Sequence, residues 1–469
     1  VSASSVAPEK KYIKQERASI ASGENYLRGA SVFKEVKKDV EDDMREQFDS
    51  EMVQELKESN HVMERGGVQF HLAKDFGFCW GVERSINLAY SAIETFPDNQ
   101  IHVTNELIHN PTVNDRLHGK NVNFIKKVDG STTNEKDFSD ISEGDVVMLP
   151  AFGATLDEMK SLEDMGVKVV DTTCPWVAKV WNTVHTHQVR GLTSVIHGKY
   201  AHEETMATKS MCETYICVKN LPEAEYLANY MLNGGDEEEF MKKFKVAASD
   251  HFDPKKHLKK IGLANQTTMY KKETRAIGQL LQRTIMAKYG PDKINEHYFE
   301  FDTICDATQT RQDAVSELCD WSSQDDIGLD FILVVGGWDS SNTAHLLEIP
   351  QMRGVRSFHI NEADCITAEN EITHRQVDGS IATDEFLPLG IDRSLRVGVT
   401  SGASTPDKAV QDALGRIIML DQGMRAKASN GGSATDHATD LSTDRSTDDS
   451  DGKGALRTML LKSAYSPRV

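Results

Sequence analysis

The sequence predicts an α/β fold of three α/β units around a common centre, preceded by an N-terminal helical extension and followed by a low-complexity tail. Strand-like apolar runs alternate with helix-like patterns, and three distant cysteines each stand where such a strand gives way to a helix. At 469 residues the chain also exceeds the length at which a single core usually divides. We expect an extension, three α/β units in pseudo-threefold arrangement and a tail over 1–65, 66–173, 174–304, 305–425 and 426–469.

The N-terminal part of the chain differs from the middle in composition. Residues 1–30 are rich in Ser, Ala, Lys and Arg, which is typical of a transit-peptide remnant and equally of an ordinary disordered leader. Residues 36–58 alternate in charge and place apolar residues at helical spacing, which predicts a helix on the surface of the main body.

The middle of the chain repeats a strand, a loop and a helix. Thr155-Leu156-Asp157-Glu158 predicts a capping box at the start of one helix, and Thr405-Pro406 opens the last one. Residues 233–258 resemble a polar insertion. Strands are expected at 145–149, 167–170, 193–196, 215–218, 261–264, 331–335 and 396–399. Helices are expected after Cys79 and Cys174 and at about 202–211, 222–232 and 272–289.

The C-terminal segment is dominated by Ser, Thr, Asp and Gly. From about Ala426 the dipeptide Thr-Asp recurs, first at Thr435-Asp436 and last at Thr447-Asp448. Such a segment has too little apolar surface to offset the entropy lost on ordering. The composition therefore predicts a disordered tail.

Three of the seven cysteines share a local context. Two follow a common signature, Asp171-Thr172-Thr173-Cys174 and Asp302-Thr303-Ile304-Cys305, and the third lies in Asp75-Phe76-Gly77-Phe78-Cys79. They are too far apart along the chain for a zinc knuckle and fit one thiolate per α/β unit. Three thiolates at one point match an iron–sulfur cluster with one iron open for chemistry, since electron-carrying clusters normally have four cysteines. The cysteines that lack this context are interpreted as structural, namely Cys212, Cys217, Cys319 and Cys365.

Polar donors follow several of the predicted strands. Hydroxyls, amides and imidazoles at strand ends suit phosphate oxygens, especially beside helix N-termini. Each alone is also an ordinary cap or turn residue. Their recurrence beside the matched cysteines predicts a phosphate site. The segments are His109-Asn110, 197–204, 266–268, 340–342 and 400–404.

Composition excludes several classes of protein. The net charge of −20 argues against a general nucleic-acid surface and means that a phosphate must be bound by local donors. No apolar run approaches the roughly 18 residues needed to cross a bilayer. An odd and sparse set of seven cysteines is unlike a secreted disulfide scaffold. A soluble intracellular enzyme is the class that remains.

At this point the motifs resemble one enzyme family, 4-hydroxy-3-methylbut-2-enyl diphosphate reductase, over about residues 66–422 and in its plastid and cyanobacterial form. This family catalyses the last step of the methylerythritol phosphate route to isoprenoids. The chain departs from bacterial members at Phe152, where they carry a His that contacts the substrate diphosphate. That contact is absent here or supplied by another group. The motifs are 77–84, 109–113, 171–177, 264–268, 303–309 and 399–404.

The resemblance implies a two-electron reductive dehydroxylation of (E)-4-hydroxy-3-methylbut-2-enyl diphosphate to isopentenyl and dimethylallyl diphosphate. It also implies one 4Fe–4S cluster whose open iron binds the substrate hydroxyl. Glu204 matches the proton donor, with Glu203 in place of a family proline as the alternative carboxylate, and Thr267 matches the residue that orients the hydroxyl. The implied cluster ligands are Cys79, Cys174 and Cys305. The implied substrate-binding residues are His109, His202, Thr267, Ser340, Ser341, Asn342 and Ser404.

Partners and location also follow from the resemblance. Its plastid and cyanobacterial relatives imply a ferredoxin-type electron donor and a chloroplast stroma, with a cyanobacterial cytoplasm as the alternative. Composition predicts neither a nucleic-acid partner nor a membrane span, and the oligomeric state is not predicted. Two other classes compete: a hydro-lyase with an open iron, which needs no reductant, and a non-enzymatic redox sensor, which binds no diphosphate.

Overall fold

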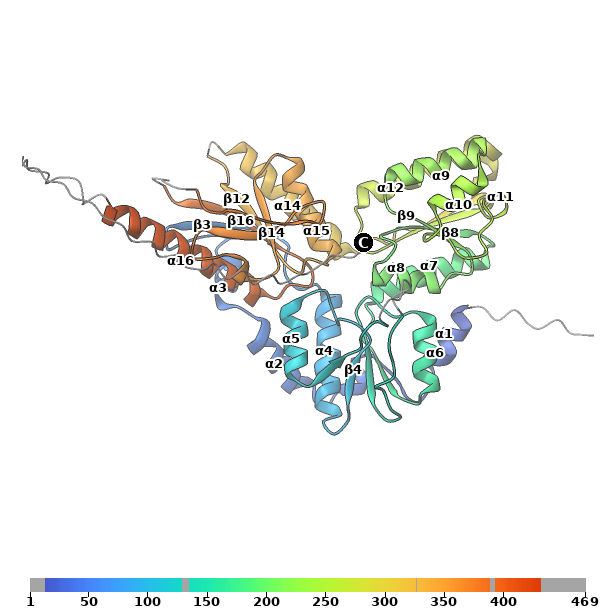
Figure 1. Ribbon diagram of the computed structural model, residues 1–469, viewed down its shortest axis with the longest axis horizontal. Coiled ribbons are helices and arrows are strands. Elements are labelled where there is room, and N and C mark those ends of the chain that lie inside the picture. Colours follow the sequence, from blue (N-terminus) through green and yellow to red (C-terminus); the bar gives the residue numbers. More distant parts are fainter. Residues whose placement is uncertain (1–12, 129–134, 326, 389–392, 432–469) are drawn as a thin grey trace, which may run out of the picture. The chain divides into compact units, whose positions relative to one another are not determined.

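The computed structural model describes residues 13–128, 135–325, 327–388 and 393–431. Its strands form three sheets within one compact unit that ends at Met424 (Figure 1). The first sheet is parallel and has the order β1 (Tyr26–Arg28), β7 (Lys168–Asp171), β6 (Val146–Leu149), β4 (Ile101–Val103) and β5 (Val122–Phe124). The second is also parallel, with the order β11 (Tyr298–Glu300), β10 (Ile261–Asn265), β8 (Thr193–His197) and β9 (Tyr215–Val218).

The third sheet is mixed. Its inner strands are parallel, and antiparallel pairs close both edges. Its order is β15 (Ile381–Glu385), β14 (Glu371–Arg375), β13 (Ser357–Ile360), β12 (Phe331–Val335), β16 (Leu395–Ser401), β3 (Val68–Leu72) and β2 (Val62–Arg65). Parallel strands need crossover connections, which are usually helices. This is why strands and helices alternate along the sequence. The predicted α/β class is therefore confirmed.

Helices connect and cover these sheets. In the first part of the chain they are α1 (Ile13–Ala21), α2 (Lys37–Phe48), α3 (Glu51–Glu58), α4 (Trp80–Thr95), α5 (Pro111–Gly119), α6 (Leu156–Asp164) and α7 (Pro175–Val189). Next come α8 (Glu203–Ser210), α9 (Leu221–Asn233), α10 (Glu237–Lys243), α11 (Pro254–His257), α12 (Lys271–Tyr289) and α13 (Ile294–His297). The last are α14 (Asp306–Gln324), α15 (Ser341–Met352) and α16 (Asp407–Gly431). Figure 1 shows α9 and α12 on one face of the second sheet and α7 and α8 on the other.

The chain passes from one sheet to the next at the three cysteines. Cys79 follows β3 of the third sheet, and the helix after it, α4, packs on the first sheet. Cys174 follows β7 of the first sheet, and α7 packs on β8 and β10 of the second. Cys305 follows β11 of the second sheet, and α14 packs on the third. One cysteine therefore stands at each crossover.

The start of the chain differs from the prediction in two respects. The single helix expected over 36–58 is two helices, because Ser50 adopts an extended backbone and its hydroxyl accepts a hydrogen bond from Val53 N as the N-cap of α3. The boundary expected at residue 66 also assigned β3 to the first unit, whereas β3 pairs with β16 in the third sheet. Both α2 and α3 bury apolar residues in the cores, including Val40 and Leu56.

The prediction of a polar insertion over 233–258 is wrong. It contains α10 and α11, and its three phenylalanines are buried in the core of the second sheet. Phe240 and Phe244 stand one helical turn apart, so both reach the same face. The ring centroids of Phe240 and Phe252 are also 6.4 Å apart and stacked. Charged residues separate these phenylalanines along the chain, so the segment looks polar when only its sequence is considered.

The two ends are described only in part. The first twelve residues of the expected leader and the tail from residue 432 lie outside the described residues. Residues 426–431, placed in the tail by composition, continue α16 as far as Gly431. Within the described part of the chain, no helix has both the length and the apolarity that crossing a bilayer requires.

Candidate active site

A single cavity collects the three crossover cysteines. Cys79, Cys174 and Cys305 all line it, together with Glu204 and Thr267. Cys305 is buried and the other two thiols are partly exposed. Each cysteine is the N-cap of a helix of more than ten residues, so three positive helix ends surround the thiols. This arrangement favours an anionic group held between the sulfurs.

Each cysteine is fixed by an equivalent backbone hydrogen bond. The amide of Cys79 donates to Ala403 O at 3.0 Å, that of Cys174 to Ala151 O at 2.8 Å, and that of Cys305 to Thr267 O at 3.1 Å. All three acceptors belong to residues that line the same cavity. In every case the acceptor lies in the loop after the neighbouring strand of the same sheet, β16 beside β3, β6 beside β7 and β10 beside β11, so this loop sets the position of the thiol.

The shared Asp-Thr signature has a structural cause. The carboxylate of Asp171 accepts a hydrogen bond from Thr173 N at 2.9 Å, and Asp302 accepts one from Ile304 N at 3.1 Å. Both are turns closed by an aspartate side chain. The following hydroxyl ties each turn to a neighbouring strand, since Thr172 donates to Leu149 O and Thr303 to the Asn265 side chain. The motif shapes the loop that presents the thiol.

Gly81 leaves space between two of the thiols. A Cβ added at this glycine would lie 2.5 Å from Cys174 Sγ and 3.9 Å from Cys79 Sγ. A larger side chain at this position would therefore collide with the Cys174 sulfur, and only glycine leaves the space between the two sulfurs open. Burial raises the pKa of Cys174 to about 12 and that of Cys305 to about 11. A metal centre would make these thiols ionise, because iron binds the thiolate form.

Glu204 is a buried acid at the edge of this cavity. It is 2% exposed, and its two oxygens accept hydrogen bonds from Thr267, at 2.6 Å from the amide and 2.9 Å from the hydroxyl. Burial raises the pKa of Glu204 to about 7, although these two bonds favour the ionised form. The geometry can deliver a proton near neutral pH through a carboxyl–hydroxyl pair.

Glu203 has a different environment from its neighbour. It does not line the cavity, and its Oε1 accepts a hydrogen bond from Asn105 Nδ2 at 2.9 Å. Burial is the largest single effect and raises the pKa of Glu203, but His109, His202 and the hydrogen bonds to the carboxylate together lower it more, so the net shift is downward. The carboxylate lies 3.7 Å from His109 Nε2. Glu203 is therefore an ionised acid that faces a histidine.

Two histidines also line this cavity. His109 is held by Glu106 through Nδ1 at 3.2 Å and stacks on Phe152, with ring centroids 4.6 Å apart. Burial lowers the pKa of His202 to about 3, so this ring is neutral. Because His202 Nδ1 accepts a hydrogen bond from Glu204 N, its remaining hydrogen lies on Nε2.

These histidines form a donor set for an anion. Ligand atoms of His109, His202 and Glu203 lie within 4.8 Å of one another, a spacing that could also hold a cation. A cation would need the lone pair of His202 Nε2, but that nitrogen carries the ring hydrogen when Nδ1 caps α8. The two imidazoles can therefore serve as donors to an anion, and the Glu203 carboxylate takes no part in binding it.

Further donors without partners line the same cavity. Among the described residues, His109 Nε2, Ser341 Oγ and Asn342 Nδ2 are buried and have no hydrogen-bond partner. The carbonyl of Asn342 accepts a hydrogen bond from Ala403 N, which leaves its NH₂ group available. Ser340 caps α15 through Thr343 N, and Ser404 donates to His109 O. The structure thus brings every predicted substrate-binding residue to one cavity.

Sequence reasoning missed the apolar wall of this cavity. This wall lies beside the thiols and consists of Val82, Ile108, Ala151 and Val177. Each belongs to a helix or loop in which an apolar residue is normally interpreted as core. Thr268 also lines the cavity and accepts a hydrogen bond from Gln266 at 2.7 Å. The apolar wall fits a short hydrocarbon between the thiols and the anion site.

The chain is similar to known proteins in both sequence and fold. The LytB protein family matches residues 70–418. A 4-hydroxy-3-methylbut-2-enyl diphosphate reductase of Picosynechococcus is 49% identical over 403 residues, covering 86% of this chain and 96% of the relative. A chloroplastic protein of that name from Botryococcus braunii is 50% identical over 369 residues, covering 78% and 72%. The fold is similar to that of the E-1-hydroxy-2-methyl-but-2-enyl-4-diphosphate reductase of Plasmodium falciparum, with a TM-score of 0.53 at 21% identity, covering 74% and 86%. The resemblance indicated by the motifs is confirmed.

Proposed function

Because the chain belongs to the LytB family, we propose that it is an iron–sulfur reductase that converts (E)-4-hydroxy-3-methylbut-2-enyl diphosphate to isopentenyl and dimethylallyl diphosphate. In this reaction the allylic C–O bond breaks and water leaves. Two electrons and two protons are consumed: one proton joins the departing hydroxyl and the other an allylic carbon. The observation that carries the proposal is one cavity that combines three thiols, a buried acid and unpartnered anion donors.

The chemistry of the three thiols fits a cubane cluster bound by three protein ligands. Cys79, Cys174 and Cys305 are the proposed ligands of one 4Fe–4S cluster, and the space kept open by Gly81 supports this. Bound there, the cluster would supply the two electrons and, at its iron without a protein ligand, Lewis acidity toward the C–O bond. Three helix N-termini would offset its negative charge.

Glu204 is the proposed proton donor to the leaving hydroxyl. In its protonated form Oε2–H can donate to Thr267 Oγ1, which reverses the bond seen at 2.9 Å and turns the threonine hydroxyl toward the cavity. Thr267 would then orient the substrate hydroxyl and pass on the proton. The Thr267 amide holds Oε1 in place meanwhile, at 2.6 Å. Burial raises the pKa of this carboxyl to about 7, so it can hold and release a proton near neutral pH.

The diphosphate is proposed to bind at the polar donors that line the cavity. The donors are the two histidines and the start of α15, where a helix N-terminus adds to the hydroxyl and amide groups. Phe152 stacks on His109 and fixes its ring without contributing a hydrogen bond. The proposed ligands are His109, His202, Thr267, Ser340, Ser341, Asn342 and Ser404.

The electron donor is proposed to be a ferredoxin-type protein, in the chloroplast stroma or a cyanobacterial cytoplasm. The named relatives support these two compartments, since one is chloroplastic and others come from organisms such as Picosynechococcus and Nostoc. A donor of one electron at a time must act twice in each turnover.

The proposed function is tested by an anaerobic assay of the cluster-loaded protein on the hydroxylated diphosphate, with dithionite-reduced methyl viologen as the reductant. Isopentenyl and dimethylallyl diphosphate are expected only when reductant is present. Conversion that proceeds equally well without reductant would identify a hydro-lyase. A protein that binds no small diphosphate in calorimetry would be a redox sensor instead.

The Ser341 hydroxyl offers a test of the diphosphate site. Ser341→Ala is expected to weaken diphosphate binding about 10- to 100-fold, because a hydrogen bond to a charged group contributes about 1.5–3 kcal/mol. Calorimetry with isopentenyl diphosphate measures the change. The matched control is Ser357→Ala, which removes another buried hydroxyl without a partner among the described residues, on β13 and outside the cavity. Equal affinities in the two variants would contradict the assignment.

A further inference from the structure

Exposed aromatic rings cluster beside the thiols. Among Trp and Phe side chains of the described residues, only Trp80, Phe301 and Trp321 are exposed, by 64%, 47% and 38%. Trp80 directly follows Cys79, and Phe301 lies four residues before Cys305. Large exposed aromatic side chains mark interaction surfaces, where they are enriched relative to the remaining surface. Two of the three are therefore close in sequence to thiols that line one cavity.

A lysine joins this region to the third thiol. Lys179 Nζ lies 4.5 Å from the ring of Trp176 and 5.1 Å from the ring of Phe301, and Trp176 follows Cys174 by two residues. One helical turn from Trp80, Arg84 donates to the carbonyls of Thr172 and Thr173, just before Cys174. We call Trp80, Arg84, Trp176, Lys179 and Phe301 the thiol-flanking face. Of its members only Trp176 also lines the substrate cavity.

The face also carries cations without acidic partners. Neither Arg84 nor Lys179 has a carboxylate within 4.0 Å among the described residues. Of the acids nearby, Asp302 is paired with Lys271 at 3.1 Å, whereas Glu41, Asp49 and Glu83 line a groove together with Trp80 and Arg84. In a chain with a net charge of −20, Lys179, which lies among aromatic rings and does not line that groove, is therefore the cation of this face that can attract an acidic surface.

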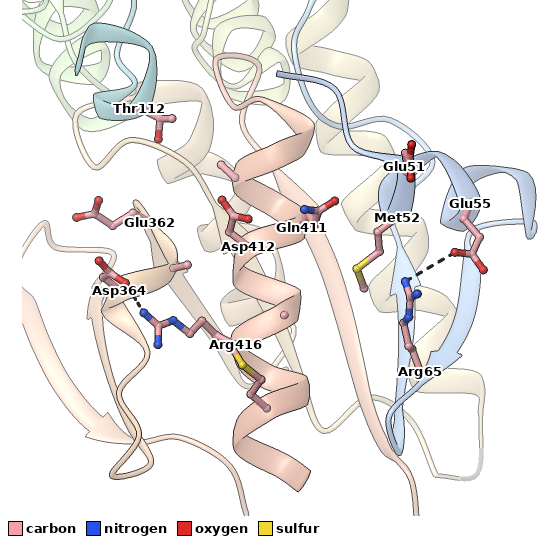
Figure 2. Close-up of a pocket in the computed structure, with 14 residues that line it drawn as sticks. Glu51, Met52, Glu55, Arg65, Thr112, Glu362, Asp364, Gln411, Asp412 and Arg416 are labelled. Carbon is pink, nitrogen blue, oxygen red and sulfur yellow. Dashed lines mark hydrogen bonds and ion pairs between the residues drawn. The ribbon is translucent and has the colours of Figure 1, made fainter. Parts of the chain in front are cut away.

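Another groove on the protein has the opposite character. Figure 2 shows acidic side chains around it, including Glu362 and Asp412. Its two arginines are already paired, Arg65 with Glu55 at 3.8 Å and Arg416 with Asp364 at 2.6 Å. This groove would repel an acidic protein, and none of the three cysteines lines it. This groove is therefore not the proposed docking site.

We propose that the thiol-flanking face docks the reduced electron carrier, a small acidic iron–sulfur protein. The inference rests on the proposed function, because only a reductase needs electrons from outside. Electron transfer slows steeply with distance, so a carrier must approach the thiols closely. At this face the Trp80 ring extends outward from the residue next to Cys79. Each docking event delivers one electron, which oxidises the carrier once, so two events complete one turnover.

The test compares two reductants on the same cluster-loaded enzyme. Trp80→Ala, Phe301→Ala and Lys179→Glu are each assayed with a reduced [2Fe–2S] ferredoxin and with dithionite-reduced methyl viologen, which needs no docking surface. The ferredoxin-driven kcat/KM is expected to fall tenfold or more, as at interface hot spots, while the viologen-driven rate stays within about twofold. The Kd for ferredoxin, measured by calorimetry, should rise in parallel.

Controls separate the docking surface from the enzyme activity. Met419→Ala removes another exposed apolar side chain, at the acidic groove, and is expected to change neither rate. Unchanged ferredoxin affinity in both Phe301→Ala and Lys179→Glu would overturn the proposal, even if Trp80→Ala disturbed the neighbouring thiol. A wild-type protein without viologen-driven turnover would refute the proposed function instead.

Discussion

Serine in place of Cys79, Cys174 or Cys305 is expected to abolish the iron–sulfur absorbance of the purified protein together with its turnover. A serine hydroxyl ionises far less readily than a thiol and is a poor ligand for iron in a cluster. Changes in the outer partners of metal ligands typically cost 10- to 100-fold, so the loss of a direct ligand should cost at least about 100-fold. Anaerobic purification with iron and sulfide quantitation, followed by the viologen assay, measures both effects.

Cys365→Ser is the matched control for these variants. Cys365 is also buried, and its thiol donates to Asn361 Oδ1 at 3.0 Å, a hydrogen bond that serine can also make. This variant should keep its iron, its absorbance and its activity. Retention of absorbance and turnover in all three variants at the crossover cysteines would show that these thiols hold no cluster.

The location of the thiols could be predicted because the motif around them is local. Asp171 and Asp302 close their own turns within two residues, so the signature can be recognised along the sequence without knowledge of the fold. The capping box at Thr155 is local in the same way, and both of its hydrogen bonds to Glu158 are present. A sequence pattern can therefore predict those features whose hydrogen bonds all join residues within one turn.

Pairings between distant segments could not be predicted. β3 pairs with β16 although more than three hundred residues separate them, and nothing in Val68–Leu72 distinguishes this partner from a strand of the first sheet. β1 similarly joins the first sheet beside β7. Local periodicity identifies a strand but carries no information on its neighbour. The expected boundary at residue 66 failed for this reason.

The content of the site was predictable only for its polar residues. His109 and Asn342 could be identified from the sequence because polar residues that follow strands are candidates for ligand binding. Val82 and Val177 follow helical spacing and look like core, so their place on the cavity wall appears only in three dimensions. The difference between Glu203 and Glu204 has the same origin, because burial and partners distinguish two adjacent acids that are identical in sequence terms.

Glu204→Gln is expected to lower kcat about 10²- to 10⁴-fold, the range that a positioned general acid contributes, and to leave iron content and diphosphate affinity unchanged. Glutamine has the same shape, and its carbonyl oxygen can still accept the Thr267 amide bond that Glu204 Oε1 accepts at 2.6 Å. Its NH₂ group can donate to the Thr267 hydroxyl but gives up no proton. Single-turnover assays with pre-reduced enzyme measure the loss at the chemical step.

The pH dependence separates this role from a structural one. Burial raises the pKa of Glu204 to about 7, so the carboxyl carries its proton below that pH and loses it above. The wild-type kcat/KM should therefore fall as the pH rises through about 7, and Glu204→Gln should lack this decline. Glu203→Gln is the matched control, since the lowered pKa of Glu203 leaves no proton to donate, and its kcat should stay within a few fold of wild type. A normal rate in Glu204→Gln combined with a large loss in Glu203→Gln would transfer the acid role to Glu203.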